Sequence, residues 1–142
     1  METEENNRLS DFEHEGQRTA VQFEATVDVA EGVQCDVYTF IDDPSKDLGV
    51  IRVNKGFNTP LQRVLQGDRT IEGYISGKGR LVVTRVSNEV EMYEFGDQPQ
   101  EHPPIDIRIG DLMQWHASED LPLVVYEICF PPYQEGRYEN IE

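Results

Sequence analysis

The segment from Val21 to Val29 alternates apolar and polar side chains at every residue, which is the period of a half-buried β-strand. Nine further segments of strand-like composition follow it, and turn residues separate nearly all of them. They are residues 33–41, 48–54, 62–65, 71–76, 80–86, 89–95, 105–109, 112–116 and 123–130. No apolar period of 3.6 residues is long enough for a substantial helix. The pattern therefore predicts an all-β closed barrel or sandwich.

The length and composition predict one folded domain with an acidic extension. A chain of 142 residues with 37% hydrophobic content can build one modest core. Residues 1–18 are rich in Glu, Asn and Asp and show no sustained apolar period, so they cannot offset their own ordering entropy. We therefore expect a flexible acidic tail over residues 1–18 and the β-domain over residues 19–142.

The charge of the chain disfavours two classes of partner. With 28 acids against 12 bases the formal net charge is −16, so a phosphate backbone is repelled and nucleic acid is not an expected partner. No apolar run approaches the roughly 18 residues that span a bilayer, and acids follow Met1 in place of a basic, then apolar, leader. We expect no membrane partner and a cytoplasmic protein. Cys35 and Cys129 stand in apolar runs, which is typical of buried thiols.

The stretch from Gly56 to Gly79 predicts two short strands around a turn, with Glu72 just before a glycine turn. This stretch resembles the first sequence motif of the cupin superfamily, small β-barrels that hold a metal or an organic ligand inside. The resemblance extends from about residue 47 to residue 133. It implies a single-domain cupin-like barrel, also called a double-stranded β-helix or jelly roll.

The metal-binding residues of that family are only partly present here. In the family, two histidines and a glutamate of the first motif and a histidine of the second typically bind a metal. Gln62 and Val64 stand where the first two histidines would be, and His116 is the candidate for the second motif. Glu72 has the family spacing to the glycine that closes the motif, and Asp68 is the alternative carboxylate. The resemblance thus implies a divalent metal ion on Gln62, Glu72 and His116 as one possibility.

Strand alternation indicates which side chains could share an interior space. Glu72 and Tyr74 lie on one face of their strand, and Gln114 and His116 lie on one face of theirs. If both faces point inward, the barrel interior can bind a sugar by hydrogen bonds. If they point outward, apolar neighbours fill the barrel instead. The candidate ligand-binding residues are Gln62, Arg63, Glu72, Tyr74, Gln114 and His116.

These observations leave several functions open. The leading hypothesis is a barrel that binds a small polar ligand of the sugar or carboxylate type and forms a homodimer through edge strands. The alternative is a metal-dependent enzyme of the dioxygenase or sugar isomerase class. A resemblance to the sugar epimerase branch of cupins implies a third, in which His116 is the catalytic base and Tyr74 the catalytic acid. The sequence does not decide whether the protein is an enzyme, nor whether it has a cofactor.

Overall fold

The computed structural model describes residues 8–14, 16–67, 69–96, 103–132 and 137–141. Within these residues the chain forms twelve β-strands and no helix, and therefore no helix that could cross a membrane. The strands are β1 (Asp11–His14), β2 (Gln17–Ala30), β3 (Val33–Phe40), β4 (Asp47–Val53), β5 (Leu61–Val64), β6 (Arg69–Gly77), β7 (Gly79–Thr84), β8 (Val90–Phe95), β9 (Ile105–Ile107), β10 (Leu112–Ala117), β11 (Leu123–Phe130) and β12 (Tyr138–Ile141).

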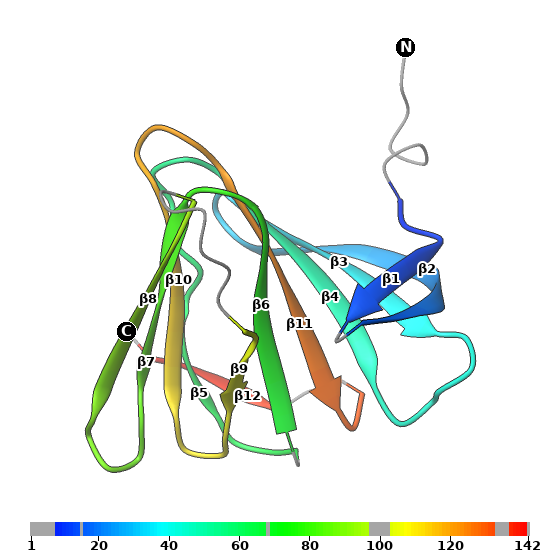
Figure 1. The fold of residues 1–142 in the computed structure, drawn as a ribbon. Coiled ribbons are helices and arrows are strands. Elements are labelled where there is room, and N and C mark those ends of the chain that lie inside the picture. The colour runs from blue at the N-terminus through cyan, green and yellow to red at the C-terminus, as the bar shows by residue number, and fades with distance from the viewer. Residues whose placement is uncertain (1–7, 15, 68, 97–102, 133–136, 142) are drawn as a thin grey trace.

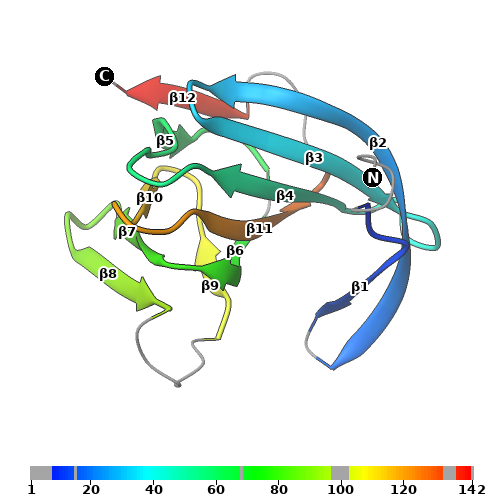
Figure 2. The same cartoon turned by 90° about the horizontal axis from the view of Figure 1, so that it is seen from above.

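The strands form two antiparallel sheets that face each other across a common interior, as Figure 1 shows. One sheet has seven strands in the order β1-β2-β3-β4-β11-β6-β9, and the other has five in the order β12-β5-β10-β7-β8. In Figure 2, which looks down on the sheets, the five-stranded sheet curls around beside the seven-stranded one. The expected all-β barrel is therefore confirmed.

All ten strands expected from the sequence are present, and two more occur at the ends of the chain. β1 lies in the segment expected to be a flexible tail, where Arg18 bonds to Asp11 at 2.7 Å and to Glu13 at 2.9 Å across the β1–β2 hairpin. Phe12 adds an edge-to-face contact with Tyr126, with ring centroids 4.9 Å apart. This part of the expected tail thus has an aromatic anchor and cross-strand ion pairs.

β12 pairs with β5 and extends the five-stranded sheet. Its position is fixed by Arg137, which is almost fully buried just before the strand begins. The Arg137 guanidinium donates to the carbonyl oxygens of Arg69 and Pro131 at 2.8 and 3.0 Å and to Oγ1 of Thr70 at 2.9 Å. These bonds attach the end of the chain across the barrel to the beginning of β6.

The apolar side chains form two separate clusters on the two faces of the large sheet. The inner cluster lies between the sheets and includes Leu81, Trp115 and Leu123. The outer cluster includes Tyr126 and Ile128, and the bend of β2 in Figure 2 brings β1 against it. Because both faces of β11 and of the first half of β6 are covered, these strands are buried on two sides.

Candidate functional site

A cavity of about 560 Å³ opens into the space between the sheets. Strands β2, β3, β4 and β11 of the large sheet form one wall, and β5 and β12 of the small sheet form the other. We call this cavity the lumen. Its described lining includes three acids, Asp28, Asp47 and Glu127, and no basic side chain. The remaining polar lining residues are Cys35, Thr59, Gln62, Cys129, Tyr138 and Asn140.

Two carboxyl groups lie side by side at the inner wall of the lumen. Glu72 on β6 and Glu127 on β11 are directly opposite each other in the strand register. Glu127 lines the lumen, whereas Glu72 is completely buried. Oε1 of Glu72 accepts a hydrogen bond from Nε1 of Trp115 at 2.7 Å. Its other oxygen, Oε2, is buried and has no donor among the described residues.

The surroundings of Glu72 favour its protonated form. Burial, followed by the nearby charge of Glu127, raises the pKa of Glu72 well above its ordinary value. Two ionised carboxylates cannot hydrogen-bond to each other, because both are acceptors only. When Glu72 is protonated, it becomes a donor to Glu127, and the buried oxygen gains a partner. The geometry therefore favours a proton on Glu72 that is donated to Glu127.

Two neutral, weakly polar groups, a thiol and a phenol, lie near Glu127. Sγ of Cys129 lies 3.4 Å from Oε1 of Glu127 and 3.4 Å from the Tyr138 hydroxyl. Burial and the Glu127 charge raise the pKa values of Cys129 and Tyr138. The same two causes raise the pKa of Cys35 to about 12. Both thiols therefore remain protonated near neutral pH and act as small polar lining groups.

Glycine at position 49 leaves room for this cluster. Gly49 lies on β4 between Val37 of β3 and Glu127 of β11. A Cβ atom at Gly49 would lie 3.0 Å from Sγ of Cys35, so a side chain there would crowd the lumen wall.

Among the expected site residues, Gln62 lies at the lumen mouth. Its side-chain amide donates to Oδ1 of Asn140 at 3.2 Å, and both residues line the cavity. Arg63 follows it on β5 and forms a solvent-exposed ion pair with Glu139 at 3.6 Å. The structure therefore places Gln62 at the lumen and does not place Arg63 among its lining residues.

His116 and Gln114 lie on the outer face of β10. Along this strand the buried residues are Met113, Trp115 and Ala117, which belong to the inner core, so the side chains between them point the other way. Nδ1 of His116 lies 2.9 Å from Oδ1 of Asn58, and the Gln114 amide donates to the carbonyl of Thr59 at 2.9 Å. Burial and then the charge of Arg80 lower the pKa of His116.

Tyr74 does point toward the inner core, yet its hydroxyl is already bonded. It donates to the carbonyl of Gly77 at 2.7 Å, and its ring stacks on Phe95 with centroids 5.1 Å apart. The structure therefore does not bring Tyr74 and His116 together, because the His116 side chain leaves β10 on the far side of the sheet. It likewise does not bring Glu72 and His116 to one interior space.

The three side chains expected to bind a metal do not converge on one point in the structure. Gln62 lies at the lumen mouth, Glu72 is buried behind Glu127, and His116 is outside the barrel. Val64, at the position of the second family histidine, is packed in the inner core and offers no donor atom. No group of three His, Cys, Asp or Glu side chains suited to a metal exists among the described residues, which leave out Asp68.

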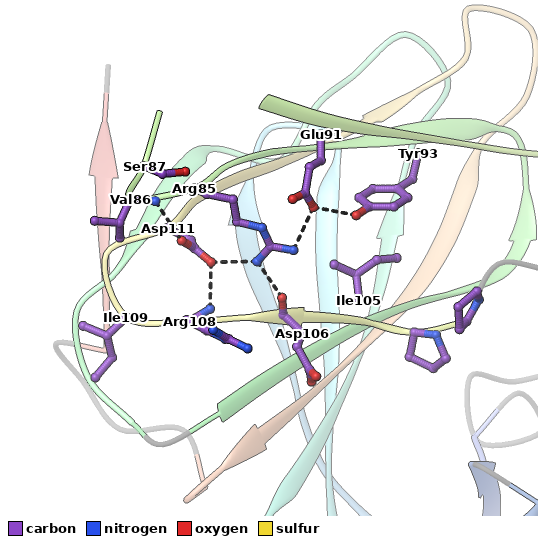
Figure 3. Close-up of a pocket in the computed structure, with 12 residues that line it drawn as sticks. Arg85, Val86, Ser87, Glu91, Tyr93, Ile105, Asp106, Arg108, Ile109 and Asp111 are labelled. Atoms are coloured by element: carbon purple, nitrogen blue, oxygen red, sulfur yellow. Dashed lines mark hydrogen bonds and ion pairs between the residues drawn. The ribbon is translucent and has the colours of Figure 1, made fainter. Parts of the chain in front are cut away.

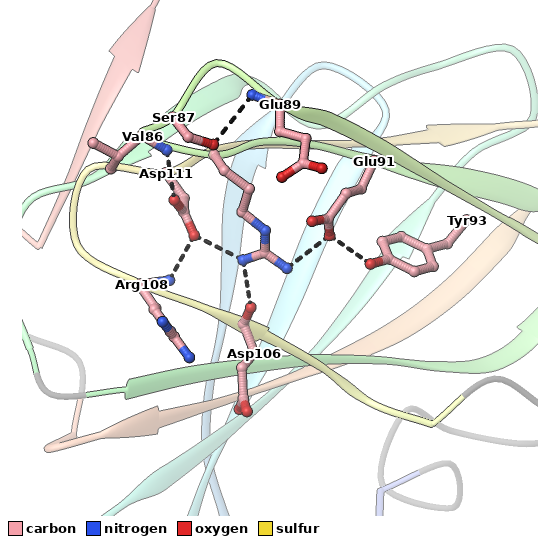
Figure 4. Close-up of polar contacts among 9 residues, drawn as sticks. Val86, Ser87, Glu89, Glu91, Tyr93, Asp106, Arg108 and Asp111 are labelled. Carbon is pink, nitrogen blue, oxygen red and sulfur yellow. Dashed lines mark hydrogen bonds and ion pairs between the residues drawn. The ribbon is translucent and has the colours of Figure 1, made fainter.

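A second cavity of about 620 Å³ lies at the seam between β8 of the small sheet and β9 of the large sheet (Figure 3). Arg85 crosses this seam, donating to Oδ2 of Asp111, to the carbonyl of Asp106 and to Oε1 of Glu91, all at 2.8 Å. Asp111, 2% exposed, also accepts from the backbone amides of Val86 and Arg108, as Figure 4 shows. We call this network the Arg85 clasp. Because protein acceptors already bind the Arg85 guanidinium, we interpret this network as structural.

The lumen residues that sequence reasoning missed include Glu127, Cys129 and Tyr138. The signal for Glu127 was present, because it is the one acid in the otherwise apolar and aromatic run LVVYEICF. Strand alternation places Val125, Glu127 and Cys129 on the same face. Tyr138 carried no comparable signal, since it begins β12, a strand that was not expected from the sequence.

The architecture defines a class of protein: a small all-β barrel of two facing sheets with an acidic lumen. No protein-family model and no curated protein matches the sequence. Solved structures do resemble the fold. Oxalate decarboxylase from Bacillus subtilis at pH 4.6 matches with a TM-score of 0.66 and 17% identity, over 83% of this chain and 30% of that chain.

CapF with the inhibitor 3-isopropenyl-tropolone matches with a TM-score of 0.60 and 16% identity, over 86% of this chain and 34% of that chain. Both are cupin-family proteins, and the chain therefore has a cupin fold. It spans about a third of the length of either protein. Mn(II) centres are described for oxalate decarboxylase in a study whose structure has a TM-score of 0.65 to this chain.

Proposed function

We propose that this protein binds a small, hydroxylated molecule such as a sugar or polyol in the lumen. The observation that carries the proposal is the cavity of about 560 Å³, which has the size of small-molecule sites and is lined by carboxyl, amide, thiol and phenol groups. Hydroxyl groups can donate to the carboxylates and accept from amide and phenol groups. The apolar parts of Ile51 and Val33 offer contact for the carbon skeleton.

Carboxylate ligands fit this lumen poorly. Asp28, Asp47 and Glu127 line it, the described lining holds no basic side chain, and the whole chain carries a net charge of −16. An anion would enter a region of negative potential and find no cation to pair with. Of the two ligand types expected from the sequence, the structure therefore supports the sugar type.

The test is direct binding of neutral sugars, measured by ligand-observed NMR and then by titration calorimetry. The panel contains glucose, galactose, mannose and their polyols. We expect binding to the wild type and a loss of about tenfold or more in Glu127→Ala, because a hydrogen bond to a charged group contributes about 1.5–3 kcal/mol. The matched control is Glu139→Ala, which removes an exposed acid near the lumen that does not line it. Equal affinity of both variants would place the ligand elsewhere.

We further propose that the cupin metal motif is degenerate in this chain and that the barrel binds its ligand without a resident metal. The proposal rests on the divergence of Gln62, Glu72 and His116 and on the core position of Val64. Titration with Mn²⁺ and Ni²⁺ should show no stoichiometric site that depends on Glu72. Stoichiometric metal that is lost on Glu72→Gln would contradict the proposal and favour the metal-dependent enzyme.

A further inference from the structure

The carboxyl pair at the inner wall of the lumen is not explained by sugar binding alone. Neutral hydroxyl groups could be held by one acid or by an amide, whereas here two acids are opposite each other on paired strands. Like charges directly opposite each other destabilise a sheet. Glu72 also leaves a fully buried oxygen without a donor. Such a group needs either a proton of its own or a hydrogen-bond donor beside it, and an ammonium group is a donor that also balances the charge of the pair.

We propose that the lumen selects a ligand that carries a protonated amine, and that its ammonium group takes the place of the proton shared by Glu72 and Glu127. This inference rests on the proposed function, since it specifies the class of small molecule that the same lumen binds. The ligand class is an amine-bearing polyol, of which amino sugars are the simplest examples. Its ammonium group contacts Glu127, which lines the lumen, while Glu72 behind it becomes ionised.

The charge balance supports this exchange. With Glu72 protonated, as its burial beside Glu127 favours, the free pair carries one negative charge. An ammonium group contributes one positive charge and three donors, and it can satisfy Glu127 directly. With that charge in place the repulsion that keeps Glu72 protonated is reduced, so a proton leaves as the amine binds. The complex then holds two carboxylates and one ammonium, with the same net charge as the free pair.

The other groups that face the pair do not replace the ammonium. They come from every neighbouring element: Cys35 on β3, Asp47 on β4, Trp115 on β10, Cys129 on β11 and Tyr138 on β12. Trp115, the thiols and the phenol are neutral, and Asp47 adds to the negative potential. No described lumen residue is a cation, so the positive charge has to come from the ligand or from a proton.

The experiment compares matched pairs of sugars at about pH 6.5, where primary amines are protonated. Glucosamine, galactosamine and mannosamine are titrated beside glucose, galactose and mannose. We expect at least one amino sugar to bind about tenfold or more tightly than its neutral counterpart, since a charged hydrogen bond exceeds a neutral one by about 1 kcal/mol or more. Repeating the titration in buffers of different ionisation enthalpy should show close to one proton released per amine bound.

Two variants distinguish this exchange from general attraction to an acidic protein. Glu72→Gln resembles the protonated acid in shape and should abolish the proton release. Glu127→Gln should abolish the preference for the amine. Glu24→Gln, which changes an exposed acid that accepts a hydrogen bond from Oγ1 of Thr39 at 2.9 Å, is the control and should change neither. The wild-type proton count needs no variant and remains informative if a variant does not fold.

The outcomes separate the two proposals. If neutral sugars bind as tightly as their amino counterparts, the inference is wrong and the proposed function stands. If amines bind without releasing a proton, or if Glu24→Gln loses the preference as Glu127→Gln does, the exchange at the pair is also wrong. If no member of either series binds, the proposed function fails and the inference fails with it.

Discussion

The pH dependence of stability in Glu72→Gln offers the sharpest check on the shared proton. In the folded protein the pKa of Glu72 is raised by burial and by Glu127, whereas in the unfolded chain it returns to about 4.3. Below that pH both states carry the proton. As pH rises above it, the unfolded chain releases the proton and the folded protein keeps it. The wild type therefore loses stability with rising pH until the folded group ionises.

The size of the effect follows from one proton. Each pH unit over which only the folded state holds the proton lowers the free energy of unfolding by about 1.4 kcal/mol. Between pH 5 and pH 7 the wild type therefore loses up to about 2.7 kcal/mol through this group. Glutamine at position 72 has no proton to lose and can still donate an N–H to Glu127. Hence the stability of the variant relative to the wild type should rise by up to about 2.7 kcal/mol over this range.

Urea unfolding at several pH values between about 5 and 7 measures this difference. Glu24→Gln on the same β-domain removes one exposed negative charge and reports the general effect of charge in so acidic a chain. We expect its difference from the wild type to change little with pH, because this side chain is exposed. A Glu72→Gln difference that is equally flat would mean that Glu72 is ionised in the folded protein, and the shared proton would have to be abandoned.

Three other predictions concern the frame of the site. Asp111→Ala removes the acceptor of one guanidinium and two backbone amides, so it should lower the free energy of unfolding by about 3 kcal/mol and Tm by about 6–12 °C in a thermal melt. The control is Asp106→Asn at an exposed ion pair, which should lower the free energy of unfolding by less than about 1 kcal/mol. If the chain is a homodimer through its edge strands, Met92→Glu on edge strand β8, where Met92 is 55% exposed, should shift light scattering from dimer to monomer. Cys35 and Cys129 should react with a thiol reagent at pH 8 far more slowly in the folded than in the unfolded protein, and equal rates would contradict their raised pKa values.

The strands could be predicted from the sequence because their signal is local. Alternation and turn residues identify each strand without knowledge of its partner, and all ten expected strands are found. β1 and β12 depend on partners far away in the chain. β1 is held by the Phe12 contact with Tyr126, and β12 follows Arg137, whose acceptors come from residues 69, 70 and 131. No pattern within these short segments reveals those partners.

Whether each site side chain points into or out of the barrel was harder to predict, and the physical reason differs between the strands. In β10 the side chains that point inward are the more apolar ones, Met113, Trp115 and Ala117. His116 alternates with them and therefore points outward. In β6 the same rule fails. Ile71 packs into the outer cluster under β1, so the inward position passes to Glu72. Apolar content identifies the buried face only when the opposite face is in solvent.

The carboxyl pair also indicates that the lumen residues serve ligand binding more than the stability of the folded protein. Two apolar residues of similar volume at positions 72 and 127 would remove a buried acid and a like-charge contact, and replacements of that kind are often neutral or stabilising. Trp115 and Cys129 are placed to satisfy one oxygen of each acid, which lowers the cost of burying the pair without removing it. The unsatisfied oxygen of Glu72 remains. The pair is unfavourable in the free protein, and a bound cation would remove that unfavourable interaction. The free energy recovered in this way would contribute to the binding of the cation. The same geometry that makes the pair unfavourable therefore favours an amine ligand.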